Sequence, residues 1–122
     1  ADRGTPGAPV YRYDNQRLTA IADSTTAILS HLLRGELSDG LVFDTVWSRL
    51  LEIGEAVKAI SPSLLATEPD IPWNNIAAMR NQLAHRYIDT EHGIVSATVT
   101  NDLEALSAAI LRLRASAGPA RN

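Results

Sequence analysis

The stretch "MRNQLAHRY", residues 79–87, gathers side chains that bind anions or move protons. These side chains are Arg80, Asn81, His85, Arg86 and Tyr87. A histidine exchanges a proton near neutral pH, and an arginine offers a planar fork of N–H donors that matches phosphate oxygens. The combination suits proton transfer beside a bound phosphate group, so the next question is how these side chains are arranged.

The apolar spacing predicts a helix that starts near Pro72 or Trp73 and carries this stretch. One stripe of that helix is predicted to face the core, and it consists of Ile76, Met79, Leu83 and Tyr87. Asn81 and His85 are four positions apart and therefore stack on another face, where Asn81 could orient the His85 ring by a hydrogen bond.

Arg80 and His85 are five positions apart, which places them about 140° from each other around a straight helix. They therefore do not converge on one small target. Either the helix distorts near its end and brings His85 round, or two copies of the motif face each other across a two-fold axis. The second arrangement would gather two copies of each group in one cleft.

A structural interpretation of the same residues stays open. A histidine near a helix C-terminus is often a cap. An arginine beside an apolar stripe can pair with a glutamate such as Glu52 or Glu55. Gly54 is predicted to lie inside a helix at a close approach between helices, because a helical glycine is otherwise costly.

Two long helices are predicted to precede the motif and to form an antiparallel hairpin. The first starts at Asp14 as its N-cap and ends at Gly35, and the second follows "SDG" and runs to about Ile60. A short turn of helix follows, with Ser61 as its cap and Pro62 at its first position.

A turn is predicted after the motif at "DTEHGI", with His92 exposed in it, and "VSATVT" is too short to make a sheet. Asn101 is predicted to cap a last helix that runs to about Ala115. Substantial helices with short connections predict an all-α bundle of four to five helices.

The composition favours one domain at 13–116, with Gly- and Pro-rich or polar tails at 1–12 and 117–122. The net charge of −3 argues against broad coating of nucleic acid, although a local cationic cleft is compatible with it. The chain has no cysteine, no metal-binding or phosphate-loop motif, no apolar run of about 20 residues and no visible signal peptide. We therefore expect a cytoplasmic protein with no metal, no cofactor and no membrane contact.

The segments "LLEIGEAVKAI" and "IPWNNIAAMRNQLAHRY" resemble the HepT-like toxins of the HEPN superfamily, which act in HepT/MntA type VII toxin–antitoxin systems. The family motif is Arg-x4-His-x-Tyr, matched here by Arg80, His85 and Tyr87, with a polar Asn81 after the arginine. Arg86 departs from the family, where glycine is frequent. The resemblance extends from about Arg17 to Leu113.

This resemblance implies an all-helical homodimer formed through the motif helices. It implies a metal-independent endoribonuclease in the dimer cleft, with Arg80 and His85 catalytic and with Asn81, Arg86 and Tyr87 supporting substrate binding. The substrate would be RNA, with transfer RNA among the candidates. The partner would be an MntA-like nucleotidyltransferase antitoxin, which transfers AMP from ATP onto Tyr87 and silences the toxin.

In the implied mechanism the 2′-hydroxyl of the RNA attacks the adjacent phosphate. One His85 would act as base and the other as acid, and Arg80 would stabilise the phosphorane. The products would be a 2′,3′-cyclic phosphate and a 5′-hydroxyl. The alternative is a non-catalytic helical HEPN module that binds and partners a nucleotidyltransferase, and a purely structural bundle is a third possibility.

Overall fold

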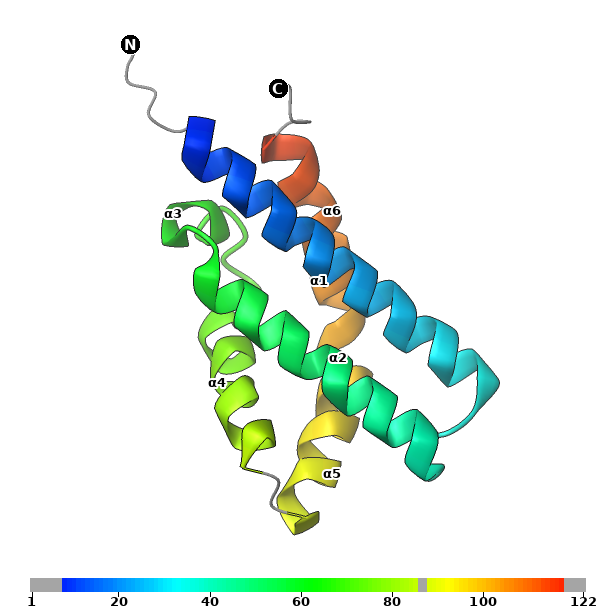
Figure 1. Cartoon of the computed structure of the whole chain (residues 1–122). Coiled ribbons are helices and arrows are strands. Elements are labelled where there is room, and N and C mark those ends of the chain that lie inside the picture. Colours follow the sequence, from blue (N-terminus) through cyan, green and yellow to red (C-terminus); the bar gives the residue numbers. More distant parts are fainter. Residues whose placement is uncertain (1–7, 86–87, 118–122) are drawn as a thin grey trace.

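A computed structural model describes residues 8–85 and 88–117 of the chain (Figure 1), and within those ranges every regular element is a helix. The predicted all-α class is therefore confirmed. The fold is a helical bundle of the kind expected for a HEPN domain, built on a long hairpin with a second helical layer against it.

Helices α1 (Ala8–Arg34) and α2 (Gly40–Ala59) form the hairpin and run side by side along most of their length (Figure 1). Asp39 begins α2, because its carboxylate accepts hydrogen bonds from the backbone N–H groups of Leu41 (2.9 Å) and Val42 (3.2 Å). The predicted antiparallel hairpin is confirmed, and it provides the rigid base on which the motif helix packs.

The predicted start of the first helix at Asp14 is wrong. Helix α1 begins at Ala8, within the segment predicted to be a tail, and Asp14 lies inside it with 2% of its surface exposed. Its Oδ1 accepts a hydrogen bond from the backbone N–H of Ser61 at 3.1 Å, just before the short helix α3 (Pro62–Leu65). Asp14 therefore does not cap its own helix, and its carboxylate instead binds the backbone 47 residues further along the chain.

Helix α4 (Trp73–Ala84) starts where the Pro-Trp pair predicts, and Glu68 fixes its position. The Trp73 indole N–H donates to the Glu68 backbone oxygen at 3.0 Å. The Glu68 carboxylate in turn accepts Arg112 from the last helix at 2.7 Å. The beginning of the motif helix is therefore tied to two other parts of the bundle.

Helix α5 (Ile88–Ala97), the π-helical turn η2 (Thr98–Asp102) and α6 (Leu103–Ala117) form one continuous helix. The turn predicted at "DTEHGI" and the cap predicted at Asn101 are therefore both wrong. The backbone N–H of Leu103 bonds to the Thr98 oxygen, five residues back, which is the signature of a π turn.

The π turn has a packing reason. Val95 and Leu103 are both buried, with 0% and 1% of their surface exposed. In a regular α-helix these residues, eight apart, would diverge by about 80°. The extra residue of the π turn makes the separation equivalent to seven, which leaves an offset of about 20°. The insertion therefore keeps both halves of the helix facing the core.

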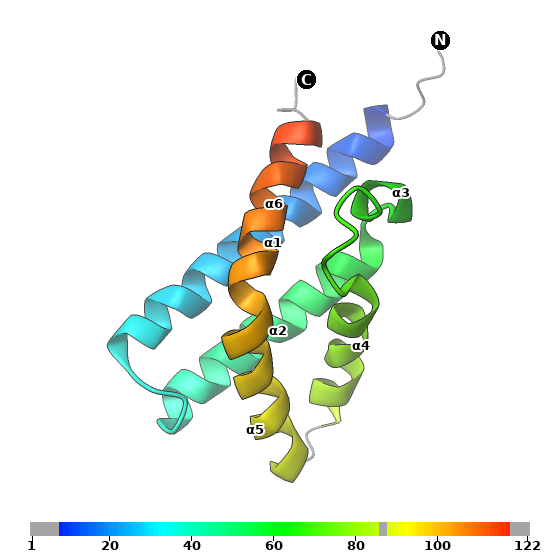
Figure 2. The same ribbon diagram turned by 180° about the vertical axis from the view of Figure 1, so that it is seen from behind.

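This long helix lies across one face of the hairpin, with α4 beside its first half (Figure 2). By length and composition alone its segment His92–Ser116 could cross a membrane, which corrects the expectation that no apolar run is long enough. Its buried face, however, packs on the core through Val95, Leu103, Leu106, Ala109, Ile110 and Leu113. A core helix of a bundle has the same composition.

Candidate functional site

Arg80 is positioned by a close approach of α4 to α2 at Gly54. A Cβ added at Gly54 would lie 2.7 Å from the Arg80 Cβ and 3.3 Å from the Ile76 backbone oxygen. The first distance is shorter than real Cβ atoms show and meets the base of a side chain, and the second is a tight contact with backbone. The predicted role of Gly54 in close packing is confirmed.

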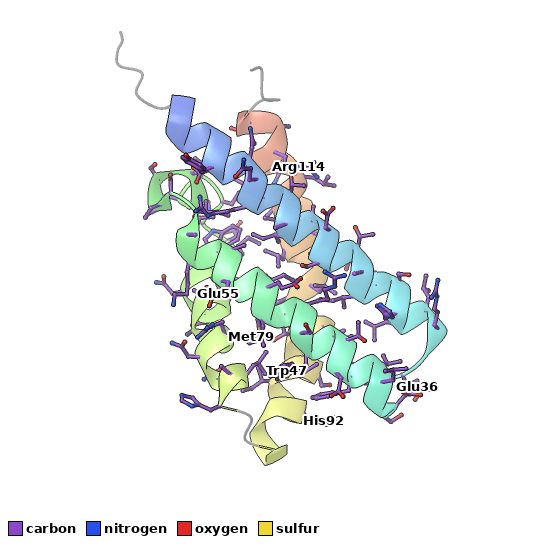
Figure 3. The ribbon with its side chains drawn as sticks, in the orientation of Figure 1. Glu36, Trp47, Glu55, Met79, His92 and Arg114 are labelled. Atoms are coloured by element: carbon purple, nitrogen blue, oxygen red, sulfur yellow. The ribbon has the colours of Figure 1, made fainter. Side chains whose placement is uncertain are left out.

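The Arg80 guanidinium forms an ion pair through Nε with the Glu55 carboxylate, and its Nη1 donates to Asn81 Oδ1 at 3.3 Å. Figure 3 labels Glu55 on the stretch of α2 that crosses α4. The side chains of Arg80 and Glu55 are 38% and 52% exposed, so the pair is worth at most about 1 kcal/mol. The predicted pairing of Arg80 with a glutamate is confirmed, with Glu55 as the partner.

Glu52, the other glutamate near Gly54, has different partners. Its Oε1 accepts a hydrogen bond from the buried Ser24 hydroxyl at 3.0 Å and pairs with Arg49 at 3.0 Å. Glu52 therefore links α1 to α2, one turn before Glu55 on the same face. Glu52 thus stabilises the hairpin, and Glu55 holds Arg80 of the motif helix.

A groove of about 420 Å³ runs between α2 and α4 in front of this pair. It is lined by Leu51, Glu52, Glu55, Ala56, Arg80 and Ala84. Its lining has two carboxylates and one guanidinium, and each carboxylate is already paired with an arginine, Glu52 with Arg49 and Glu55 with Arg80. The groove of a single protomer therefore has no excess positive charge to attract phosphate. A phosphate site here needs further cations or a rearranged Glu55.

His85 is the C-cap of α4, as one of the two interpretations predicts, and it is exposed. Its φ and ψ of −77° and −15° lie in the right-handed helical region, and its backbone N–H bonds to the Leu83 oxygen. A regular helix would place Arg80 and His85 about 140° apart. Arg80 lines the α2 groove, and His85 is not among the residues that line it.

Comparison with known proteins decides the family. Residues 18–113 match the model of the family described as ribonuclease HepT-like. This chain belongs to the HepT-like family. No solved structure matches the chain with statistical significance.

Two curated relatives agree with this assignment. A "probable ribonuclease HepT" of Thermococcus cleftensis is 37% identical over 67 residues, which cover 54% of this chain and 61% of that protein. A "putative RNase" of Caldanaerobacter subterraneus subsp. tengcongensis is 33% identical over 66 residues, covering 53% of this chain and 59% of the relative. The chain therefore spans about three fifths of the length of these relatives.

The described residues of this HepT-like chain account for only part of the predicted site. Arg80, Asn81 and His85 lie on α4 and at its end, and Asn81 acts on Arg80 through its side-chain oxygen. The predicted contact of Asn81 with His85 stays a prediction. Arg86 and Tyr87 lie outside the described residues, so their predicted roles are not addressed by this geometry.

His92 is the other histidine near the motif, and its predicted place in a turn is wrong. It lies in α5, and its ring stacks on Phe43 of α2 with 4.3 Å between ring centroids and 12° between planes. Figure 3 labels His92 at the end of the bundle where α5 meets α2. This contact joins residues 49 positions apart, so no local sequence signal announces it.

Proposed function

We propose that this HepT-like chain is an endoribonuclease of the toxin type, with Arg80 and His85 as its catalytic residues. The observation that carries the proposal is the family match over residues 18–113, a range that includes the Arg-x4-His-x-Tyr sequence of Arg80, His85 and Tyr87. The geometry supports it, because both groups occupy half-exposed or exposed positions at the end of one helix.

The chemistry requires only groups that the chain contains. His85 of one protomer takes the proton of the RNA 2′-hydroxyl, and the 2′-oxygen then forms a bond to the adjacent phosphorus. The bond from phosphorus to the 5′-oxygen breaks, and the second His85 gives a proton to that oxygen. Arg80 donates hydrogen bonds to the phosphorane oxygens as charge builds on them. The products are a 2′,3′-cyclic phosphate and a 5′-hydroxyl, and no step calls for a metal.

A homodimer supplies the convergence that one protomer lacks. Arg80 and His85 are five positions apart, and a helix of regular geometry would place them about 140° from each other. Two such helices related by a two-fold axis would bring Arg80 of one protomer towards His85 of the other. The dimer would also bring Arg80 and His85 of both protomers to one cleft.

Glu55 has a defined place in this scheme. In the described protomer its carboxylate pairs with the Nε side of the Arg80 guanidinium. An incoming RNA phosphate would bind the remaining donors of the guanidinium, against the repulsion of the Glu55 charge. Glu55 would then hold Arg80 in a fixed orientation and weaken its attraction for phosphate.

The proposed control of the toxin is transfer of AMP from ATP to Tyr87 by an MntA-like nucleotidyltransferase antitoxin. This part rests on the family motif, since Tyr87 lies outside the described residues. Adding AMP two residues after His85 places bulk and negative charge where RNA phosphate must bind. Incubation with that partner and ATP would add the mass of one AMP to the wild type and none to Tyr87→Phe.

The alternative function is a non-catalytic HEPN module that partners the nucleotidyltransferase, and the Arg80–Glu55 pair is the observation that favours it. An RNase assay in EDTA separates the two, with wild type beside His85→Ala and with the product ends analysed. The proposal predicts cleavage by the wild type alone, leaving cyclic phosphates. Equal cleavage by both proteins contradicts it, and no cleavage by a wild type of unmodified mass supports the module.

A further inference from the structure

A second cavity lies on the opposite flank of α4, between this helix and the π turn. Its volume is about 220 Å³. Ile76 and Met79 form a buried apolar floor, with 3% and 4% of their surface exposed. Three polar side chains line its rim, namely Asn75 and Gln82 of α4 and Asp102 of η2. Figure 2 shows α4 and the α5–η2 helix side by side at this flank.

The π turn helps to build this cavity. Thr98 and Asp102 are its first and last residues, and both line the cavity. The Thr98 hydroxyl is already engaged, since it lies 2.7 Å from the Ile94 backbone oxygen and 3.3 Å from the Met79 sulfur. Thr98 therefore completes the wall, and the hydrogen-bonding capacity towards a ligand comes from Asp102 and the two amides.

Those three rim side chains make no hydrogen bond or ion pair within the described part of the chain. Asn75 and Gln82 are exposed, and Asp102 is half-buried. A carboxylate offers only acceptors, whereas each amide offers both donors and acceptors. The cavity therefore combines an apolar floor of Ile76 and Met79 with polar groups along its edge. An unstacked RNA base, which has apolar faces and a hydrogen-bonding edge, matches this arrangement.

The position of the cavity relates it to the proposed catalytic histidine. Gln82 and His85 are three residues apart on a backbone that stays helical, so their side chains are neighbours on the surface of α4. Arg80, by contrast, faces the groove on the other flank. A nucleotide whose base enters the cavity would have its sugar and phosphate beside His85.

We propose that this cavity is the base-binding subsite for the nucleotide next to the cleaved bond, and that it selects guanine. Guanine presents two adjacent donors, N1–H and the N2 amino group, which match the two oxygens of Asp102. Its O6 accepts a hydrogen bond from an amide of Asn75 or Gln82. Uracil, cytosine and adenine do not offer two adjacent donors. The role of the subsite next to a cleaved bond rests on the proposed ribonuclease function. Binding of guanine in the cavity can be measured independently of that function.

The test is a titration of the labelled protein with each of the four nucleoside 3′-monophosphates, followed by NMR. Guanosine 3′-monophosphate is expected to shift the Met79 methyl and Ala97 signals at the lowest concentration. Asp102→Asn is expected to weaken its binding about tenfold and to abolish the preference for guanine. Asp23→Asn, an exposed carboxylate on α1, is the matched control and leaves binding unchanged.

Equal binding of all four nucleotides, no shift at the cavity, or an unchanged Asp102→Asn would overturn the inference. Cleavage of a random-sequence RNA separates this failure from failure of the proposed function. Cleavage without preference for guanine, equal in wild type and Asp102→Asn, refutes the subsite and leaves the ribonuclease. Binding of guanosine 3′-monophosphate at the cavity of a protein that cuts no RNA keeps the selection of guanine by the cavity and refutes the ribonuclease.

Discussion

The two flanks of α4 are built in opposite ways. Towards α2 the helix is pressed against Gly54 so closely that a methyl group would collide with Arg80. Towards α5 the same helix leaves an open cavity of about 220 Å³ beside a π turn. The tight flank fixes the orientation of a charged group, and the open flank leaves room for a ligand. Helix α4 thus presents the Arg80 guanidinium on one side and a cavity that can hold a ligand on the other.

The largest effect is expected from Gly54→Val, which would break the tight flank. The added carbon atoms meet the Arg80 Cβ and the Ile76 backbone oxygen, so α4 must move away from α2. We expect a loss of about 2–3 kcal/mol in the free energy of unfolding, measured by urea denaturation. Gly93→Ala is the control, because a Cβ there meets nothing within 4 Å, and it should stabilise by up to about 1 kcal/mol. Equal effects at both glycines would refute the tight packing.

A smaller effect is expected from Glu55→Gln, which frees the Arg80 guanidinium while keeping the shape of the side chain. We expect RNA affinity to rise about threefold at low salt, because one competing charge is removed from a half-exposed pair. The affinity is measured by fluorescence anisotropy with a labelled RNA. Both proteins carry His85→Ala, so that the RNA is not cleaved during the measurement. Weaker RNA binding would mean that Glu55 is needed to position Arg80 more than it competes with phosphate.

Ala97→Leu probes the open flank. The larger side chain projects towards free volume, so the free energy of unfolding should change by less than about 0.5 kcal/mol. Nucleotide binding at the cavity should nevertheless be lost, because the leucine occupies part of the space. A loss of stability comparable to that of Gly54→Val would show that this flank is as closely packed as the other.

The smallest effect is expected at the start of α4, which both flanks share. The hydrogen bond from Arg112 lowers the pKa of Glu68 from its ordinary value of 4.5. The pair therefore stabilises the folded state above that value, and its contribution is lost as the pH falls through the lower pKa of the folded state. Thermal unfolding of wild type and Glu68→Gln should differ slightly at pH 6 and converge towards pH 3. A constant difference would exclude this linkage.

The sequence predicts the tight flank better than the open one. Gly54 inside a helical pattern, with glutamates beside it and Arg80 on the motif helix, is a local signal of close packing and charge pairing. Local signals of the same kind mark the helix boundaries at Gly35, Asp39 and Trp73. Asp14 shows the limit, because its carboxylate accepts a hydrogen bond from the backbone N–H of Ser61, which only the tertiary fold brings near.

The open flank depends on a feature with no local signature. Glycine at position 93 and the β-branched run 98–100 predict an interruption, yet the chain continues as one helix through a π turn. The turn forms because Val95 and Leu103 must both reach the core, which is a tertiary requirement. The cavity edged by Asp102 follows from that register, so periodicity alone could not have located it.

The central claim is that one RNA phosphate meets Arg80 and His85 from different protomers. It is tested most directly by letting wild type exchange subunits with an approximately ninefold excess of the inactive double variant Arg80→Ala/His85→Ala. Native mass spectrometry confirms that mixed dimers form. A composite site predicts that RNA cleavage per wild-type protomer falls to about one tenth, since few wild-type protomers then meet another. Cleavage per wild-type protomer that stays constant in the mixture would contradict the claim.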